Sequence, residues 1–398
     1  MKYSLPLFGT LILLLSCSLK EDTIGLEKGI SLELAKYRKQ QVSNVVYDLD
    51  FNIPAAKSAP ILSSLTLMLT IQELSQDLFL DFNAAKSNLK SLKVNGQKVT
   101  INHQNEHLIV SKEALVLGKN TLVVSFIAGE LSLNRNEDFL YTLLVPDRAS
   151  TLFPCFDQPD IKATYQLTIT APKEWEVLCG AFEQNAIEMG DFTKHIFSQT
   201  DKMSTYLFSF VAGKFTAVTK NPGAFDMRFL YRENNQEKIE ESLDEVFLIH
   251  QKSLDFLEEY TQVKFPFQKM DFAAIPPFQY GGMEHVGAIQ YRASSLFLDK
   301  NATQNRKLSR AKLIGHETSH MWFGDLVTMR WFNDVWMKEV CAKFMADKIM
   351  KPVLPEINHR LNFMMSHYPS AYSEDRTKGT NAIRQYLGNL KNAGSLYG

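Results

Sequence analysis

The sequence contains little cysteine and no cysteine pair at metal-binding spacing. Only four of its 398 residues are cysteines, and no two of them form a Cys-x-x-Cys motif. This scarcity argues against a thiolate metal site and against a small fold held together by disulfides. Cys155 and Cys179 could pair in an oxidising compartment, but packed free thiols are the preferred interpretation.

The chain also lacks a strong excess of charge and a long apolar run in its body. Its formal net charge is -1, whereas a nucleic-acid-binding domain needs a basic face, so no nucleic-acid partner is predicted. Beyond residue 17, no stretch is apolar enough to span a bilayer. With 45% hydrophobic residues, the chain is long enough for two or three domains with cores of their own.

Residues 1–17 are typical of an export signal. Lys2 supplies a positive charge, residues 7–15 form a short apolar run, and Ser16 precedes Cys17. A small residue before cysteine is typical of a bacterial lipoprotein signal, in which Cys17 would carry the lipid and attach the protein to the membrane. An ordinary secretory signal is the alternative. The prediction is an exported bacterial protein that faces the periplasm or is anchored as an outer-membrane lipoprotein.

The hydrophobic pattern divides the remaining chain into three segments. Residues 18–41 are polar and are predicted to be a tether with some helix. Residues 42–215 alternate with period two and contain an Asn-Gly hairpin signal after residue 94, which predicts an all-β domain. Residues 216–398 change to a helical pattern, with an amphipathic helix over 236–260 and another from about Lys307. His250 is interpreted as a half-buried helix residue.

A single stretch carries the strongest chemical signal. Residues 316–320 read His-Glu-Thr-Ser-His, which on a helix puts His316 and His320 on one face, about one turn apart. Glu339 follows after eighteen further residues. Two histidines and one carboxylate leave a coordination position open for water, as in a catalytic zinc site. The sequence therefore predicts one Zn²⁺ per chain on these three residues, with Glu317 as the general base.

Two aspartates near this motif are candidates for supporting the metal ligands. A ligating imidazole needs an acceptor for its second ring nitrogen. Asp325 and Asp334 lie close enough in sequence to provide one. Roles in turns or helix caps are the alternative for both.

Three blocks in the same order resemble the M1-type gluzincin zinc aminopeptidases. The first, residues 153–160, reads Phe-Pro-Cys-Phe-Asp-Gln-Pro-Asp and is similar to a Phe-Pro-Cys-Phe-Asp-Glu-Pro signature of that family. The second, residues 281–285, reads Gly-Gly-Met-Glu-His and resembles the family's Gly-x-Met-Glu-Asn loop. The third is the metal motif. Together the blocks cover roughly residues 141–339.

The resemblance implies both a fold and a reaction. The fold is α+β and multidomain, with a saddle-like N-terminal β-sandwich domain closed by a strand at 206–215 and an incomplete thermolysin-like zinc metallopeptidase domain. The reaction is removal of N-terminal amino acids from peptides with a free N-terminus. Glu284 would bind the substrate's α-amine through a charge-assisted contact, and the adjoining Gly281, Gly282 and Met283 would lie beside the substrate.

The sequence departs from the family pattern at several positions. His285 replaces the Asn of the loop, and a position that carries a second amine-binding group in many relatives falls on Val145, with Asp147 as a weak substitute. The family's transition-state tyrosine is expected at or beyond Gly398, so Tyr397 is interpreted as a neighbour of it. The chain is therefore expected to be the N-terminal portion of a longer enzyme and poorly active alone.

Two other functions stay open from the sequence. One is an epoxide hydrolase with aminopeptidase side activity, which shares the metal motif within the same family. The other is a non-catalytic lipoprotein that contains zinc and binds peptides. The sequence indicates no oligomeric state.

Overall fold

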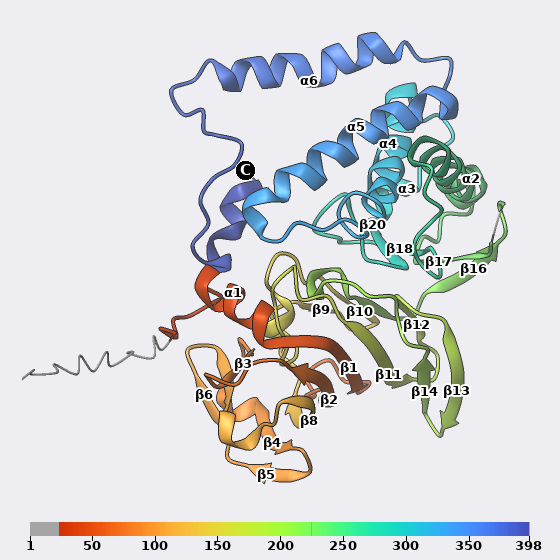
Figure 1. The fold of residues 1–398 in the computed structure, drawn as a ribbon. Coiled ribbons are helices and arrows are strands. Elements are labelled where there is room, and N and C mark those ends of the chain that lie inside the picture. The colour runs from red at the N-terminus through yellow and green to blue at the C-terminus, as the bar shows by residue number, and fades with distance from the viewer. Residues whose placement is uncertain (1–23, 224, 398) are drawn as a thin grey trace, which may run out of the picture.

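A computed structural model of the chain describes residues 24–223 and 225–397, apart from the side chain of Tyr397. The predicted signal at 1–17 with Cys17, and the interpretation of the Tyr397 side chain, lie outside the described residues. A β-rich N-terminal part is followed by a part with a small sheet and most of the helices, which confirms the predicted α+β class (Figure 1). In the part that the structure describes, no helix is long and apolar enough to cross a membrane.

The helices of the chain include a few longer ones and several short 3-10 turns. The α-helices are α1 (Leu32–Gln41), α2 (Gln236–Thr261), α3 (Ala293–Leu296), α4 (Gln304–His320), α5 (Val335–Val353) and α6 (His359–Asp375). The 3-10 turns are η1 (Lys86–Asn88), η2 (Lys112–Ala114), η3 (Ala149–Thr151), η4 (Thr205–Leu207), η5 (Phe332–Asp334) and η6 (Leu390–Tyr397).

The largest sheet forms one layer of the β-rich part, with strand order β13-β14-β11-β1-β2-β8-β4-β5. Its strands are β1 (Val42–Asn52), β2 (Leu62–Ile71), β4 (Leu89–Val94), β5 (Gln97–Val99), β8 (Gly118–Ile127), β11 (Thr164–Pro172), β13 (Glu183–Met189) and β14 (Phe192–Phe197). Asn95 and Gly96 connect β4 to β5 with φ angles of 49° and 83°, which confirms the predicted hairpin. The alternation predicted around residues 65–71 is also confirmed, because β2 buries every second side chain there.

Two smaller sheets complete the β-rich part. One has the order β12-β15-β10-β9 and the other β3-β7-β6. Their strands are β3 (Leu78–Asp81), β6 (Asn102–Gln104), β7 (His107–Val110), β9 (Leu133–Arg135), β10 (Phe139–Thr142), β12 (Glu176–Cys179) and β15 (Phe210–Gly213).

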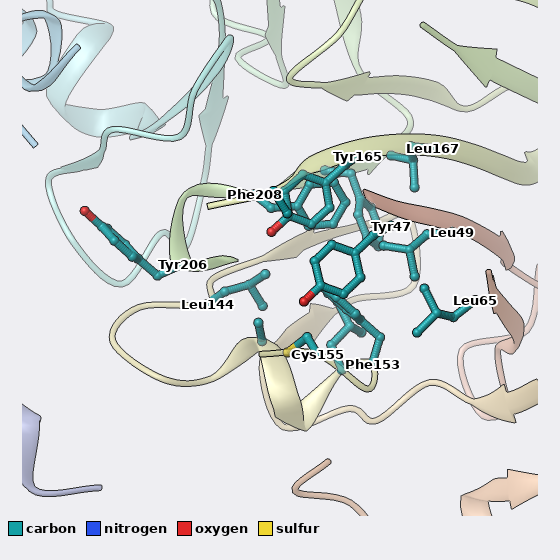
Figure 2. Packing of buried hydrophobic residues seen from close by; sticks show 14 of the residues in the cluster. Tyr47, Leu49, Leu65, Leu144, Phe153, Cys155, Tyr165, Leu167, Tyr206 and Phe208 are labelled. Carbon is teal, nitrogen blue, oxygen red and sulfur yellow. The ribbon is translucent and has the colours of Figure 1, made fainter. Parts of the chain in front are cut away.

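Aromatic rings form the centre of the β-rich core. Tyr165 stacks on Tyr47 and on Phe208, with ring centroids 5.1 and 4.4 Å apart (Figure 2). Buried Cys155 lies in the same cluster, and both it and buried Cys179 are free thiols. The preference for packed free thiols is therefore confirmed.

The segment 206–215 does not form the continuous closing strand that was expected. Its first residues belong to η4, and only β15 pairs with neighbouring strands. Figure 2 shows Tyr206 pointing away from the aromatic stack. Its hydroxyl donates to the Gly324 carbonyl at 3.4 Å, in the helical part of the chain. This side-chain anchor holds η4 between the two parts of the molecule.

The second half of the segment predicted as a tether contains α1. Arg38 of α1 is fully buried and forms two hydrogen bonds to the carboxylate of Asp81 on β3, of 2.6 and 2.7 Å. Burial alone would raise the pKa of Asp81, but the charges of Arg38 and His107 outweigh it and lower that pKa to about 2. This ion pair attaches α1 to the β-rich part.

The helical part is built on a five-stranded sheet with the order β16-β17-β18-β20-β19. Its strands are β16 (Thr216–Lys220), β17 (Met227–Tyr231), β18 (Asp271–Ile275), β19 (Gly282–Met283) and β20 (Ala288–Arg292). Helices α2, α4 and α5 share one apolar core with this sheet (Figure 1). The helices predicted over 236–260 and from about Lys307 are confirmed as α2 and α4. Strand β19 lies at the edge of the sheet.

His250 of α2 is fully buried rather than half-buried. Its Nδ1 donates to the Val246 carbonyl at 2.8 Å, and its Nε2 accepts from the Tyr291 hydroxyl at 2.9 Å. Burial lowers the pKa of His250 to about 4, so the folded chain holds a neutral imidazole here.

This histidine predicts a pH-dependent stability. As the pH falls from 6.5 to about 4, the unfolded chain binds a proton on His250 and the folded chain does not. The free energy of unfolding should therefore fall by up to about 3 kcal/mol more in the native chain than in His250→Gln. Urea titrations of both proteins across this range measure the difference. Tyr291→Phe keeps the imidazole buried and should retain the pH dependence; a constant difference between native and His250→Gln would contradict the prediction.

Candidate metal centre and substrate site

The structure brings the three predicted metal ligands together. His316 and His320 lie in the last turns of α4, and their Nε2 atoms are 3.1 Å apart. Glu339 lies near the start of α5, and its Oε2 is 3.6 Å from Nε2 of His316 and 3.9 Å from Nε2 of His320. Three ligand atoms from two helices therefore surround one point.

These atoms fit a zinc ion. Bonds of about 2.0–2.2 Å from a tetrahedral Zn²⁺ place its ligand atoms about 3.3–3.6 Å apart. The observed separations of 3.1, 3.6 and 3.9 Å lie close to this range. Burial lowers the pKa of His320 to about 4, which keeps the neutral form that metal binding requires.

Glu317 lies next to the same point but is the weaker candidate for a ligand. Its carboxylate and the two histidines form a group whose ligand atoms lie within 4.8 Å of one another. Glu339 is assigned as the ligand because its Oε2 lies 3.6 and 3.9 Å from the two Nε2 atoms, close to the separations that a tetrahedral zinc ion requires. Burial, with the negative charges of Glu284 and Glu339, raises the pKa of Glu317 well above its ordinary value. A carboxylate with a raised pKa is a stronger base, as the predicted role requires.

Close packing of α4 against α5 delivers Glu339 to the two histidines. Gly315 faces α5, and a Cβ atom built on it would lie 3.4 Å from the Met350 side chain and 3.6 Å from Cα of Ala346. The connection between the helices is fixed in part by Trp322, whose Nε1 donates to the Val263 carbonyl at 3.1 Å. The eighteen residues between His320 and Glu339 are the turn and chain reversal that this packing needs.

The second ring nitrogen of His320 has a backbone partner instead of an aspartate. Its Nδ1 donates to the Phe323 carbonyl at 3.1 Å, in the turn that follows α4. Asp334 is paired with Arg384 at 2.6 Å. Asp325 is buried, and its backbone N–H donates to the His320 carbonyl at 3.0 Å. The prediction of a carboxylate partner is thus wrong for His320, because the tight turn already supplies an acceptor.

Glu284 directly follows edge strand β19 and is paired with a lysine. The ammonium of Lys338 donates to Oε1 of Glu284, and the two side chains are only 4% and 5% exposed. Burial alone would raise the pKa of Glu284, but the charge of Lys338 outweighs it and lowers that pKa to about 2. Sequence reasoning missed Lys338; the only signal was a basic residue directly before the ligand Glu339.

The two glycines of the loop have different surroundings. A Cβ atom on Gly282 would lie 2.4 Å from Oε1 and 2.7 Å from Cγ of Glu317. A Cβ atom on Gly281 would meet only the end of the Leu313 side chain, at 3.2 Å. Gly282 therefore makes room for the predicted base, and Met283 beside it is buried.

The positions that depart from the family pattern are also placed. Val145 is a buried residue of the β-rich core. Asp147 does not join Glu284; it lines a small cavity with Asp81 and Lys391, and burial raises its pKa to about 6. His285 is buried, and its Nδ1 donates to the Leu207 carbonyl of η4 at 3.2 Å, which ties the loop over residues 281–285 to the β-rich part.

Comparison with known proteins covers both parts of the chain. Residues 44–207 match the peptidase M1 N-terminal domain, and residues 246–398 match the peptidase family M1 domain. The chain belongs to peptidase family M1.

Several aminopeptidases are similar to this M1 chain. It is 29% identical to Probable aminopeptidase 1 of Sulfurisphaera tokodaii over 75% of its length and 38% of the relative's. It is 31% identical to puromycin-sensitive aminopeptidase of Caenorhabditis elegans, over 66% and 28% of the two chains. For human endoplasmic reticulum aminopeptidase 2 the identity is 35%, over 53% and 22%. The chain thus spans between about a fifth and two fifths of the length of these relatives.

The ligand assignment predicts how variants bind metal. The native M1 chain should hold about one zinc per chain, His316→Ala should lose most of it, and Glu339→Gln should bind it much more weakly, because each change removes a ligand. Glu317→Gln is the matched control and should retain the metal. Elemental analysis after dialysis measures the stoichiometry. Unchanged zinc in His316→Ala, or loss of zinc in Glu317→Gln, would overturn the assignment.

Proposed function

We propose that this M1 chain forms the zinc site and the amine-recognition site of an aminopeptidase. One observation carries the proposal: the ammonium of Lys338 that is bound to Glu284 lies only 3.5 Å from Oε1 of Glu339. The position of this ammonium shows how far from the metal ligands any ammonium bound to Glu284 would lie. An α-ammonium at the same place would have its own carbonyl carbon two bonds away, so the first peptide bond of a substrate would lie beside the zinc position.

The chain's own residues supply most of the remaining chemistry. A bound zinc ion would act as a Lewis acid toward the scissile carbonyl and the attacking water. Glu317 would accept the proton of that water and pass it to the leaving amine, in keeping with its burial and raised pKa. Edge strand β19 has one neighbour, β20, which leaves its outer side for an extended peptide to pair with.

Peptide substrates are favoured over the two alternatives. The relatives reported above are named as aminopeptidases, and the carboxylate Glu284 next to an edge strand suits a peptide with a free N-terminus better than an epoxide. A non-catalytic zinc protein would not need the additional carboxylate of Glu317, which is buried close to the two histidines. Hydrolysis of aminoacyl-anilides that chelator abolishes and zinc restores would support the proposal, and its absence in the whole natural protein would contradict it.

Replacement of the proposed base should separate metal binding from turnover. Glu317→Gln cannot accept the proton of water, so we expect kcat to fall by about a hundred- to ten-thousandfold with zinc content and KM nearly unchanged. Steady-state kinetics at equal zinc occupancy measures this. A variant with near-native kcat would exclude Glu317 as the base.

The two loop glycines offer a matched pair of variants. Gly282→Ala places a methyl group 2.4 Å from Oε1 of Glu317, so the base must move and kcat should fall at least tenfold. In Gly281→Ala the new methyl group meets the flexible end of Leu313 at 3.2 Å, and we expect a much smaller effect. Kinetics of both variants at full zinc occupancy provides the comparison. Equal losses would show that Gly282 has no special relation to Glu317.

We propose further that Cys17 carries a lipid that anchors the protein to a bacterial membrane. The apolar run over residues 7–15 and the Ser16-Cys17 pair support this. The native protein should stay with membranes after a salt wash, and Cys17→Ser should not. If Cys17→Ser remains membrane-bound, Cys17 is not the anchor; if both are soluble, the leader is an ordinary secretory signal.

A further inference from the structure

Lys338 occupies a complete binding site for an ammonium group. Besides its contact with Glu284, its Nζ lies 3.5 Å from Oε1 of Glu339 and 5.0 Å from the centre of the Tyr206 ring. Two carboxylates and one aromatic face are the groups that bind ammonium ions most strongly in proteins. The side chains of Lys338 and Glu284 are 4% and 5% exposed, so water competes little with this contact.

We propose that Lys338 is a built-in competitor for the amino-terminal ammonium of the substrate, an inference that rests on the proposed role of Glu284. The two ammonium groups have the same charge and the same hydrogen-bonding capacity. They cannot occupy one place, and like charges at close range in a buried site repel strongly. A peptide therefore engages Glu284 only by displacing Lys338.

The surroundings of Lys338 leave room for this displacement. The residue borders a cavity of about 260 Å³, whose lining is mainly apolar and includes Phe323, Met337 and Cys341, together with Arg330 and with Asp334, which is paired with Arg384. The long aliphatic part of lysine suits such an apolar space, and its charged end can reach water at the opening of the cavity. The side chain can move aside while helix α5, and with it Glu339, stays in place.

Competition of this kind sets substrate preference. When a ligand with a free amine binds, its ion pair with Glu284 replaces the ion pair between Lys338 and Glu284. The contact with Glu284 therefore adds little net binding free energy. A ligand with a blocked, uncharged amine does not enter the exchange. Lys338 thus weakens the binding of ligands that have a free amino terminus. It reduces the difference in affinity between these ligands and ligands whose amino terminus is blocked.

Binding of a small amine that lacks a peptide bond provides the test. Calorimetry of the zinc-loaded chain with L-leucinol and with N-acetyl-L-leucinol compares a charged and an uncharged ligand. In Lys338→Met, leucinol should bind roughly ten- to a hundredfold more tightly than in the native chain, the range expected from one charged hydrogen bond. Lys338→Arg keeps a cation and should remain near the native affinity. Binding of the acetylated compound should be equal in all three proteins.

Two results separate failure of this inference from failure of the proposed function. If Lys338→Met binds leucinol no more tightly than the native chain, but adding Glu284→Gln abolishes that binding, Glu284 is the anchor and Lys338 is no competitor. If adding Glu284→Gln to Lys338→Met leaves leucinol binding unchanged, Glu284 is not the amine anchor at all.

Loss of Lys338 leaves a buried carboxylate unpaired and reduces stability. Lys338→Gln is therefore the second variant, because its amide still donates a hydrogen bond to Glu284 but carries no charge. We expect leucinol to bind this variant more tightly than the native chain, by the same factor as Lys338→Met. Leucinol should also raise the Tm of either variant more than that of the native chain. Equal Tm shifts in native and variant proteins would overturn the inference.

Discussion

The site depends on the close packing of helix α5 against helix α4. Two histidines four residues apart on α4 provide only two ligands, and the third exists because the start of α5 lies beside them. Gly315 lies at that interface, opposite Met350 and Ala346. In the same arrangement two consecutive residues of α5 contact different groups. Glu339 lies beside the histidines, and Lys338 contacts Glu284. A small shift of α5 would therefore change the proposed metal site and the proposed amine site together.

The β-rich part contributes directly to this arrangement. The ring of Tyr206 in η4 lies 5.0 Å from the ammonium of Lys338. The hydroxyl of Tyr206 donates to the carbonyl of Gly324, which follows α4. The carbonyl of the next residue, Leu207, accepts from His285 in the loop over residues 281–285. One short 3-10 turn thus contacts both the lysine and the loop that carries Glu284. The N-terminal domain is part of the site's structure, and its aromatic core positions that turn.

Features that short sequence patterns determine could be predicted from the sequence. Contacts between residues far apart in the chain could not. The grouping of His316, His320 and Glu339, helix α2 and the Asn-Gly hairpin follow from spacing, periodicity and turn chemistry, which act within a few residues or one motif. The Glu284–Lys338 pair joins positions 54 residues apart, and no local pattern announces it. The break of the expected strand at η4 likewise accompanies a tertiary contact, from Tyr206 to Gly324. The backbone partner of His320 is local, but it comes from a tight turn that hydrophobic periodicity does not record.

We propose that one zinc ion binds between α4 and α5, next to the carboxylate of Glu284 that Lys338 holds. A crystal structure of the zinc-loaded chain, with anomalous data collected at the zinc absorption edge, tests it most directly. We expect one strong peak about 2.0–2.2 Å from Nε2 of both histidines and from the Glu339 carboxylate, with Glu317 outside bonding distance and Lys338 still on Glu284. A peak bonded to Glu317 in place of Glu339, or located away from the two histidines, would contradict it.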